Sequence, residues 1–254
     1  MSQTAARWLD NESQDAVDLF WRSAGAFEDF PRTLERPLAL ALPVALVKLP
    51  RLRLKDIEHW LKARSIPFSF NCQSRAMHGC LVAFAGQGVI FVDGADPADQ
   101  QRVSMAHEVG HFLLDHLGPR QRAVVRFGPQ ILEAFDGRRA LTMSERLTGV
   151  LQGAPLGVHT DLIERDTASD LERTWRIENR ADRVAMALLA PPEDILKRFD
   201  NWVPDYSTRL GTLAGILQSS YGLPDYVSRG YAAELLHSCG KGPSWAESLR
   251  RVMK

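Results

Sequence analysis

The segment His107-Glu108-Val109-Gly110-His111 places two imidazoles four residues apart, with a carboxylate directly after the first. On a helix, residues four apart lie on one face, so both rings can reach a single ion while Glu108 projects beside them. Two such histidines and a glutamate are half of a catalytic zinc site, in which the glutamate activates a water at the metal. The chemistry that this spacing indicates is hydrolysis.

The surrounding residues favour a metal site over a pair of solvated histidines. Buried imidazoles need polar partners, and a shared metal ion supplies one. Gly110 inside a helix costs about 1 kcal/mol relative to alanine, so its presence predicts that another segment packs closely there. Between Gln101 and Leu117, apolar residues recur at helical spacing and predict a mostly buried helix: Val103, Ala106, Gly110, Leu113 and Leu117.

A third zinc ligand is predicted on a later helix. In residues 175–189, five side chains share one helical face, and two of them are alanines that would let another helix pack closely: Glu178, Ala181, Asp182, Ala185 and Leu189. Glu178 would complete a His-His-Glu ligand set, and Asp182 would accept the free N–H of a ligand histidine. Each acid alone is more often a solvated helix residue. Their pairing with the alanines favours the metal site.

Two segments of the chain together resemble the zinc peptidases of the ImmA/IrrE family, whose pattern reads AHELGHxLL and then ExxADxFAxxLLxP. Here residues 106–114 read AHEVGHFLL and residues 178–191 read ENRADRVAMALLAP. The resemblance includes the hairpin at 79–94 and, weakly, the tail at 222–229. It implies that His107, His111 and Glu178 hold zinc and that Glu108 is the general base. The implied fold is mainly helical α+β, gluzincin-like, with a small three-stranded sheet before the HExxH helix.

Members of this family typically cut a partner repressor of the helix-turn-helix class, in responses to DNA damage, mobile-element excision or phage infection. The resemblance therefore implies a zinc-dependent endopeptidase with such a substrate, similar in length to the longer forms in phage-defence operons. Two alternatives stay open: a zinc-stabilised regulatory or DNA-binding protein without catalysis, and a peptidase of general peptides. The intact Glu108 argues against the first, because structural zinc sites need no base.

The spacing of the two motifs departs from the family pattern. His111 and Glu178 are 67 residues apart (178 − 111), which predicts an insertion at about 118–174, and Val184 replaces the usual phenylalanine. His159 in the insertion would suit either oxyanion stabilisation or a plain surface position. Six arginines in its first part usually indicate a solvated face, although they would also suit a regulatory nucleic acid: Arg120, Arg122, Arg126, Arg138, Arg139 and Arg146.

Strands are predicted at 68–72, 77–85 and 89–93, with a turn at 86–88. In this class of peptidase, a strand before the HExxH helix forms the rim of the cleft, and a peptide substrate adds to it as an antiparallel strand. The candidate rim residues are His78, Gly79, Cys80, Leu81 and Val82.

Cys80 on this rim suggests a regulatory hypothesis. A thiolate is a strong zinc ligand, so a cysteine within reach of the fourth position would keep the enzyme inactive until it was displaced. Cys72 is a weaker candidate by the same logic. The alternative is that Cys80 is a small buried apolar residue, as free cysteines commonly are.

The composition is that of a globular chain large enough for a core, with 254 residues of which 45% are hydrophobic. Together with this length, the resemblance implies one metallopeptidase unit over 1–254, with an N-terminal helical part (1–66), a catalytic core (67–200) and a C-terminal helical part (201–254). Further helices are predicted at 13–24, 52–63, 193–199, 208–221 and 225–237. The last two suggest a helix-turn-helix shape, which we interpret as structural packing.

The charge and the cysteine content bear on partners and compartment. The 31 basic and 31 acidic residues give a formal net charge of zero, hence no general attraction to nucleic acid or membranes. Three cysteines disfavour a secreted disulfide scaffold. The first residues lack the apolar core of a signal peptide, and the apolar stretch 38–49 is too short to span a bilayer. We expect a cytoplasmic protein.

Overall fold

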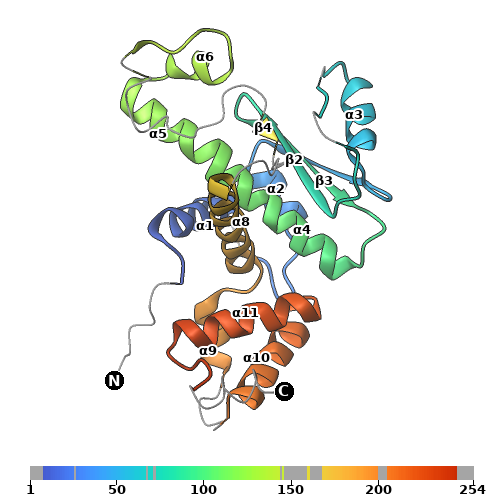
Figure 1. Ribbon diagram of the computed structural model, residues 1–254, viewed down its shortest axis with the longest axis vertical. Coiled ribbons are helices and arrows are strands. Elements are labelled where there is room, and N and C mark those ends of the chain that lie inside the picture. Colours follow the sequence, from blue (N-terminus) through green and yellow to red (C-terminus); the bar gives the residue numbers. More distant parts are fainter. Residues whose placement is uncertain are drawn as a thin grey trace.

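The computed structural model describes residues 8–25, 27–66, 68–70, 73–143, 145, 159–160, 168–199 and 205–244. Figure 1 shows a small sheet with the long helix α4 (Ala98–His111) beside it. Helices α9 to α11 lie at one end of the molecule, and α5 and α6 extend at the other. The mainly helical α+β fold predicted from the sequence is confirmed.

The sheet has four strands in the order β1-β3-β2-β4. They are β1 (Val44–Leu49), β2 (Gly79–Phe84), β3 (Gln87–Asp93) and the two-residue β4 (His159–Thr160). Strand β1 is parallel to β3, whereas β2 is antiparallel to both β3 and β4. Ala85 and Gly86 form the turn between β2 and β3, with φ of 52° and 80°. Two consecutive positive φ angles are the signature of the tight turns that match the twist of a hairpin.

The predicted strands at 77–85 and 89–93 are confirmed, but the third one is wrong. Residues 68–70 are not in a strand, and Phe68 and Phe70 instead pack against the cluster beneath the sheet. Residues 71 and 72 lie outside the described residues. The strand that pairs with β3 in addition to β2 is instead β1, which precedes β3 by more than forty residues in the chain. Such a long-range parallel pairing leaves no local turn signal in the sequence.

The two faces of the sheet pack against different helices, since successive strand side chains point to opposite sides. Leu81 and Ala83 belong to the main core, which includes Ala106 and Val109 of α4. On the other face, the strand residues pack with the helix α3 (Leu54–Lys62) in a smaller cluster, formed by Leu52, Ile57, Leu61, Cys80, Val82 and Phe91.

The remaining helices agree with the sequence pattern within a few residues. They are α1 (Asn11–Ala24), α9 (Pro192–Arg198), α10 (Tyr206–Tyr221) and α11 (Asp225–Ser238). The short helix α2 (Glu35–Ala41) was not predicted from the sequence. Side chains of Asp10 and Asp205 accept the N–H groups of Ser13 and Thr208 and so cap α1 and α10. No helix among the described residues is both long and apolar enough to cross a membrane.

The pair α10 and α11 has the packing role predicted for it. Leu213 and Leu217 of α10 and Tyr231 and Leu235 of α11 are buried in the main core. The hydroxyl of Tyr231 donates to the carbonyl of Ala190, just after helix α8, at 2.8 Å. This end of the chain is therefore attached to the helix that bears the second motif.

Helix α4 continues into a π-helical segment, Phe112–Leu117, and then into α5 (Gly118–Phe127). Three glycines of the β2–β3 hairpin lie along this helix. Gly79, Gly88 and Gly86 approach Glu108, Phe112 and His116, which are spaced four residues apart on one helical face. A Cβ atom on Gly88 would be 3.0 Å from the Phe112 ring, and the Gly86 N–H donates to His116 Nε2 at 3.0 Å. The hairpin is thus fixed along the HExxH helix.

Helix α8 (Ala168–Leu189) begins inside the predicted insertion and packs across α4. The two helices meet at Gly110, where an added Cβ atom would be 2.8 Å from the carbonyl oxygen of Ala181. The close approach predicted from Gly110 and from the alanine stripe is confirmed.

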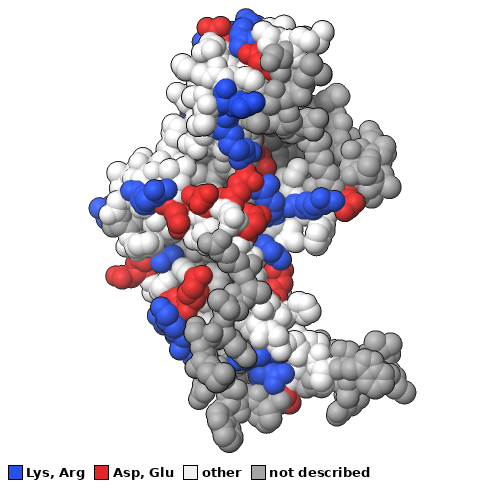
Figure 2. Space-filling model, turned by 90° about the vertical axis from the view of Figure 1, so that its left-hand side faces the viewer, with Lys and Arg blue, Asp and Glu red and all other residues white. Residues whose placement is uncertain are grey.

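The first part of the insertion forms α5 and the short helix α6 (Ile131–Phe135), which share a small apolar cluster. Four of its six arginines are in ion pairs: Arg120 and Arg138 with Asp136, Arg122 with Glu12, and Arg139 with Glu145. Figure 2 shows basic and acidic side chains interleaved on one face of the molecule. These pairs reduce the free positive charge that a nucleic acid would require.

Candidate metal centre

Three side chains from α4 and α8 converge at the crossing of these helices. His107 Nε2 and His111 Nε2 are 2.9 Å apart. Glu178 Oε2 lies 3.3 Å from His107 Nε2 and 4.0 Å from His111 Nε2. Among the described residues, these three form a group that can hold a metal ion. The structure thus brings together the three residues predicted as ligands.

The spacing of these atoms fits a tetrahedral ion. Ligand atoms about 2.0–2.1 Å from a tetrahedral zinc are roughly 3.3 Å from each other, and the three measured separations lie around that value. Two imidazoles and one carboxylate with a fourth position for water are the donor set of catalytic zinc sites. The residues present therefore fit the ion that the sequence predicts.

Each histidine has a carboxylate on the nitrogen that faces away from the group. Asp182 Oδ1 lies 2.8 Å from His107 Nδ1, as predicted. Asp115 Oδ2 lies 2.9 Å from His111 Nδ1, a contact that the sequence analysis missed. The signal was present, because Asp115 is four residues after His111 and residues at this spacing share a helical face. An N–H donated from Nδ1 leaves the lone pair of Nε2 for the metal.

These carboxylates give His107 an unusual proton affinity when no metal is bound. Burial is the largest single influence and lowers the pKa of His107, but hydrogen bonds with Asp182 and Glu178 outweigh it. The net effect raises the pKa to about 10. The carboxylates around His107 thus favour a positive charge at this site, as expected of a group that attracts a cation.

Glu108 lies on the same helix, 6% exposed, next to the first residue of β2. A Cβ atom on Gly79 would be 2.8 Å from Glu108 Oε1, so only glycine leaves room for this carboxylate in its observed position. The predicted general base is therefore in contact with the predicted rim strand, and its charge acts on His107 of the metal group.

The rim itself is shorter than predicted. Val82 pairs with Thr160 and Ala83 with His159, so β4 of the insertion covers this part of the outer edge of β2. Gly79, Cys80 and Leu81 have no strand partner on that edge among the described residues. Val82 is hence removed from the candidate rim, for a reason that depends on the distant insertion.

His78, predicted as a rim residue, lies just before β2, and its side chain is exposed with the Nδ1 atom 2.8 Å from Asp96 Oδ2. His159 lies in β4 rather than in a loop. His116 faces the hairpin turn and accepts the hydrogen bond from Gly86 described above.

The structure does not bring Cys80 to the metal group. Its side chain is buried in the α3 cluster, on the face of the sheet opposite to α4. Alternation along β2 explains this, since Gly79 and Leu81 face α4 and the residue between them must face away. Cys80 therefore has the apolar packing role that was the alternative to a zinc switch. Cys72 lies outside the described residues.

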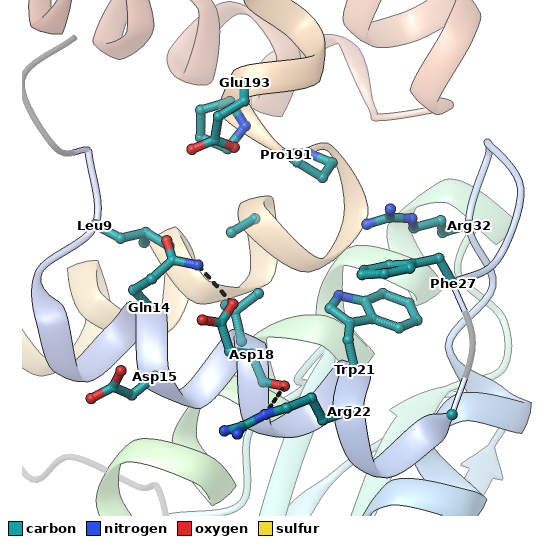
Figure 3. A pocket seen from close by; sticks show the side chains of 14 residues that line it. Leu9, Gln14, Asp15, Asp18, Trp21, Arg22, Phe27, Arg32, Pro191 and Glu193 are labelled. Atoms are coloured by element: carbon teal, nitrogen blue, oxygen red, sulfur yellow. Dashed lines mark hydrogen bonds between the residues drawn. The ribbon is translucent and has the colours of Figure 1, made fainter. Parts of the chain in front are cut away.

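A pocket of about 640 Å³ lies between α1 and the start of α9. Figure 3 shows Trp21, Phe27 and Arg32 stacked at one end, and the Arg32 guanidinium is 4.7 Å from the centre of the Trp21 ring. Its lining includes Asp15, Asp18 and Glu193 but none of the three metal-group residues. The candidate metal centre is thus separate from this pocket.

Residues 68–135 match the family model described as the IrrE N-terminal-like domain, Peptidase_M78. The matched segment contains the β2–β3 hairpin, the HExxH helix and α5 and α6, and it ends before Glu178 and Asp182. No curated protein and no solved structure matches the chain.

Proposed function

Since residues 68–135 match the model of the IrrE N-terminal-like peptidase domain, we propose that this protein is a zinc-dependent endopeptidase. The observation that supports it best is the convergence of His107, His111 and Glu178, with Glu108 buried beside them. A structural zinc site would close all four positions with protein ligands and would need no neighbouring base. Here three ligands and a base are present among the described residues.

His107, His111 and Glu178 would hold the ion, through the two Nε2 atoms and a carboxylate oxygen. Zinc in such a site lowers the pKa of a water and polarises the scissile carbonyl. Glu108 accepts the proton of the attacking water and passes it to the leaving amine. Asp182 and Asp115 accept the Nδ1–H groups of the two histidines and fix their tautomers.

The substrate in this proposal is an extended peptide that pairs with the outer edge of β2. Gly79, Cys80 and Leu81 present their backbone there, and Gly79 is the residue next to Glu108. A strand that adds to this edge runs past the base and the metal group, with hydrogen bonds to the backbone rather than to a specific sequence. Because β4 pairs with Val82 and Ala83, the substrate has the first half of β2 available.

We further propose that the physiological substrate is a partner helix-turn-helix repressor, cut in response to stress or phage infection. The support is the resemblance of the two motifs to ImmA/IrrE peptidases, together with the family match of residues 68–135. A repressor offers an extended linker between folded parts, the kind of segment that an edge strand can bind.

The test is to incubate the purified protein with the product of a neighbouring repressor gene and to compare Glu108→Gln with the wild type. The amide keeps the shape of Glu108 but cannot accept the proton, so we expect full zinc content and at least a 100-fold loss of cleavage. Glu172→Gln on the exposed part of α8 is the matched control and should cleave normally. Equal cleavage by Glu108→Gln would contradict the mechanism.

The same experiment separates the alternatives. A protein that binds zinc, represses or activates transcription and is indifferent to Glu108→Gln would be a non-catalytic regulator. Cleavage of unrelated unfolded peptides at the same rate as the repressor would indicate a general peptidase.

A further inference from the structure

We propose that Asp115 is a positioning residue that orients His111 for zinc before helix α8 is in place. This inference rests on the proposed function, because it concerns how the same site is assembled. Asp115 touches neither a reacting atom nor the metal group, and it acts through His111.

The contact between the two residues is local and largely buried. The His111 side chain is 1% exposed and Asp115 is 18% exposed, with 2.9 Å between Nδ1 and Oδ2. Asp115 follows His111 on a continuous helical path from α4 into the π-helical segment. The residues between them, Phe112, Leu113 and Leu114, are buried and apolar.

The carboxylate decides which nitrogen of His111 has the proton. An ionised carboxylate only accepts hydrogen bonds, so Nδ1 must be the donor and Nε2 keeps its lone pair. Nε2 is the atom that faces His107 Nε2 and Glu178. Asp115 therefore selects the tautomer that a metal requires, and its negative charge increases the basicity of the ligand.

The two histidines differ in where their partners come from. Asp182, the partner of His107, lies on α8, 75 residues away in sequence, and its side chain is 64% exposed. Glu178 is on the same helix, so α8 supplies both the third ligand and the orientation of His107. The partner of His111 Nδ1 has a local source, because Asp115 is four residues along the same helix.

It follows that the first half of the site is preorganised on α4 and that packing of α8 completes it. A fixed imidazole loses less conformational freedom when it binds an ion, which increases affinity. Asp115 should hence contribute to zinc affinity even though it makes no contact with the ion.

The experiment compares zinc affinity, by chelator competition, in the wild type, Asp115→Ala and Asp115→Asn. Loss of the partner should weaken zinc binding about 10- to 100-fold in Asp115→Ala. Asp115→Asn should be intermediate, because an amide oxygen still accepts the Nδ1–H but has no charge. The matched control is Asp18→Ala, which also removes a helix carboxylate that accepts an i,i+4 side-chain hydrogen bond, in this case from Gln14. It should leave zinc affinity unchanged.

The melting temperature of the metal-free protein distinguishes positioning from a merely structural role. A structural role lowers this temperature and leaves zinc affinity intact, and that result would overturn the proposal. If Asp115→Ala does not fold, the isosteric Asp115→Asn decides, and wild-type affinity in that variant would equally overturn it. A wild type that binds zinc but cleaves no repressor would contradict the proposed function only, whereas a wild type without zinc affinity would contradict both.

Discussion

Gly110 lies directly against the backbone of Ala181, and an added Cβ atom would be 2.8 Å from the Ala181 oxygen and 3.0 Å from its Cα atom. Ala181 sits between Glu178 and Asp182 on α8. The absence of a side chain at Gly110 therefore sets how closely both acids approach the two histidines. Contact at this pair is the geometric basis of the candidate metal centre.

The first prediction concerns this helix crossing. The methyl group of Gly110→Ala would push α4 and α8 apart where they cross. We therefore expect a loss of about 1–3 kcal/mol in the free energy of unfolding. Zinc affinity should fall with it, because Glu178 and Asp182 move away together. Denaturant unfolding and zinc titration measure the two effects.

Gly211→Ala on α10 is the control for this substitution, since an added Cβ atom there meets nothing within 4 Å. Alanine should stabilise that exposed helical position by up to about 1 kcal/mol. A Gly110→Ala protein as stable as the wild type would show that the crossing tolerates the extra methyl group.

A second prediction separates the metal-binding glutamate from other acids of α8. Glu178→Ala should lose stoichiometric zinc, because two histidines alone leave the ion without its third protein ligand. Glu172→Ala, two turns earlier and paired with Arg176 at the surface, should retain it. Metal analysis after dialysis gives the readout, and zinc retained in Glu178→Ala would remove this residue from the ligand set.

A third prediction tests the contact between the rim strand and the base. Gly79→Ala places a methyl group 2.8 Å from the present position of Glu108 Oε1, so the carboxylate must shift. A displacement on the order of 1 Å at a catalytic group costs up to roughly 100-fold in rate, so kcat should fall while zinc content stays normal. Gly230→Ala on α11, where the added Cβ atom has open space, serves for comparison. Unaltered kcat in Gly79→Ala would show that Glu108 can adjust.

A fourth prediction addresses the substrate rather than the enzyme. If a peptide adds to the edge of β2, its own backbone N–H groups take part in binding. A single N-methyl group near the scissile bond should raise KM only at every second position. The reason is that the backbone N–H groups of alternate residues point to a given neighbouring strand. A uniform effect along the peptide would argue for recognition by side chains alone.

The predictions that the structure confirms rest on local sequence patterns. The i,i+4 spacing of His107 and His111, the glycine between them and the two acids four residues apart on one helical face each follow from helix periodicity. The β2–β3 hairpin was also predicted, since its strands are neighbours joined by a short turn. The contact of Asp115 with His111 belongs to the same local class, because the two residues are four apart on one helix.

The predictions that were wrong concern strands that pair over a long distance in sequence. Strand β1 reaches β3 across more than forty residues, and β4 reaches β2 from within the insertion. Neither pairing involves a short connecting turn, and neither produces a periodic pattern in the sequence that would reveal the partner strand. The β4 pairing covers the edge of β2 at Val82 and leaves the edge next to Gly79 open.

By itself, the sequence determined the residue types of the site and the helices that present them, because helical periodicity relates positions three or four apart. Only the tertiary structure decided that Glu178 reaches the histidines, that Cys80 faces α3 and that β4 pairs with Val82 and Ala83. These outcomes depend on which surfaces meet when the chain packs, and packing joins residues whose distance along the chain gives no periodic signal.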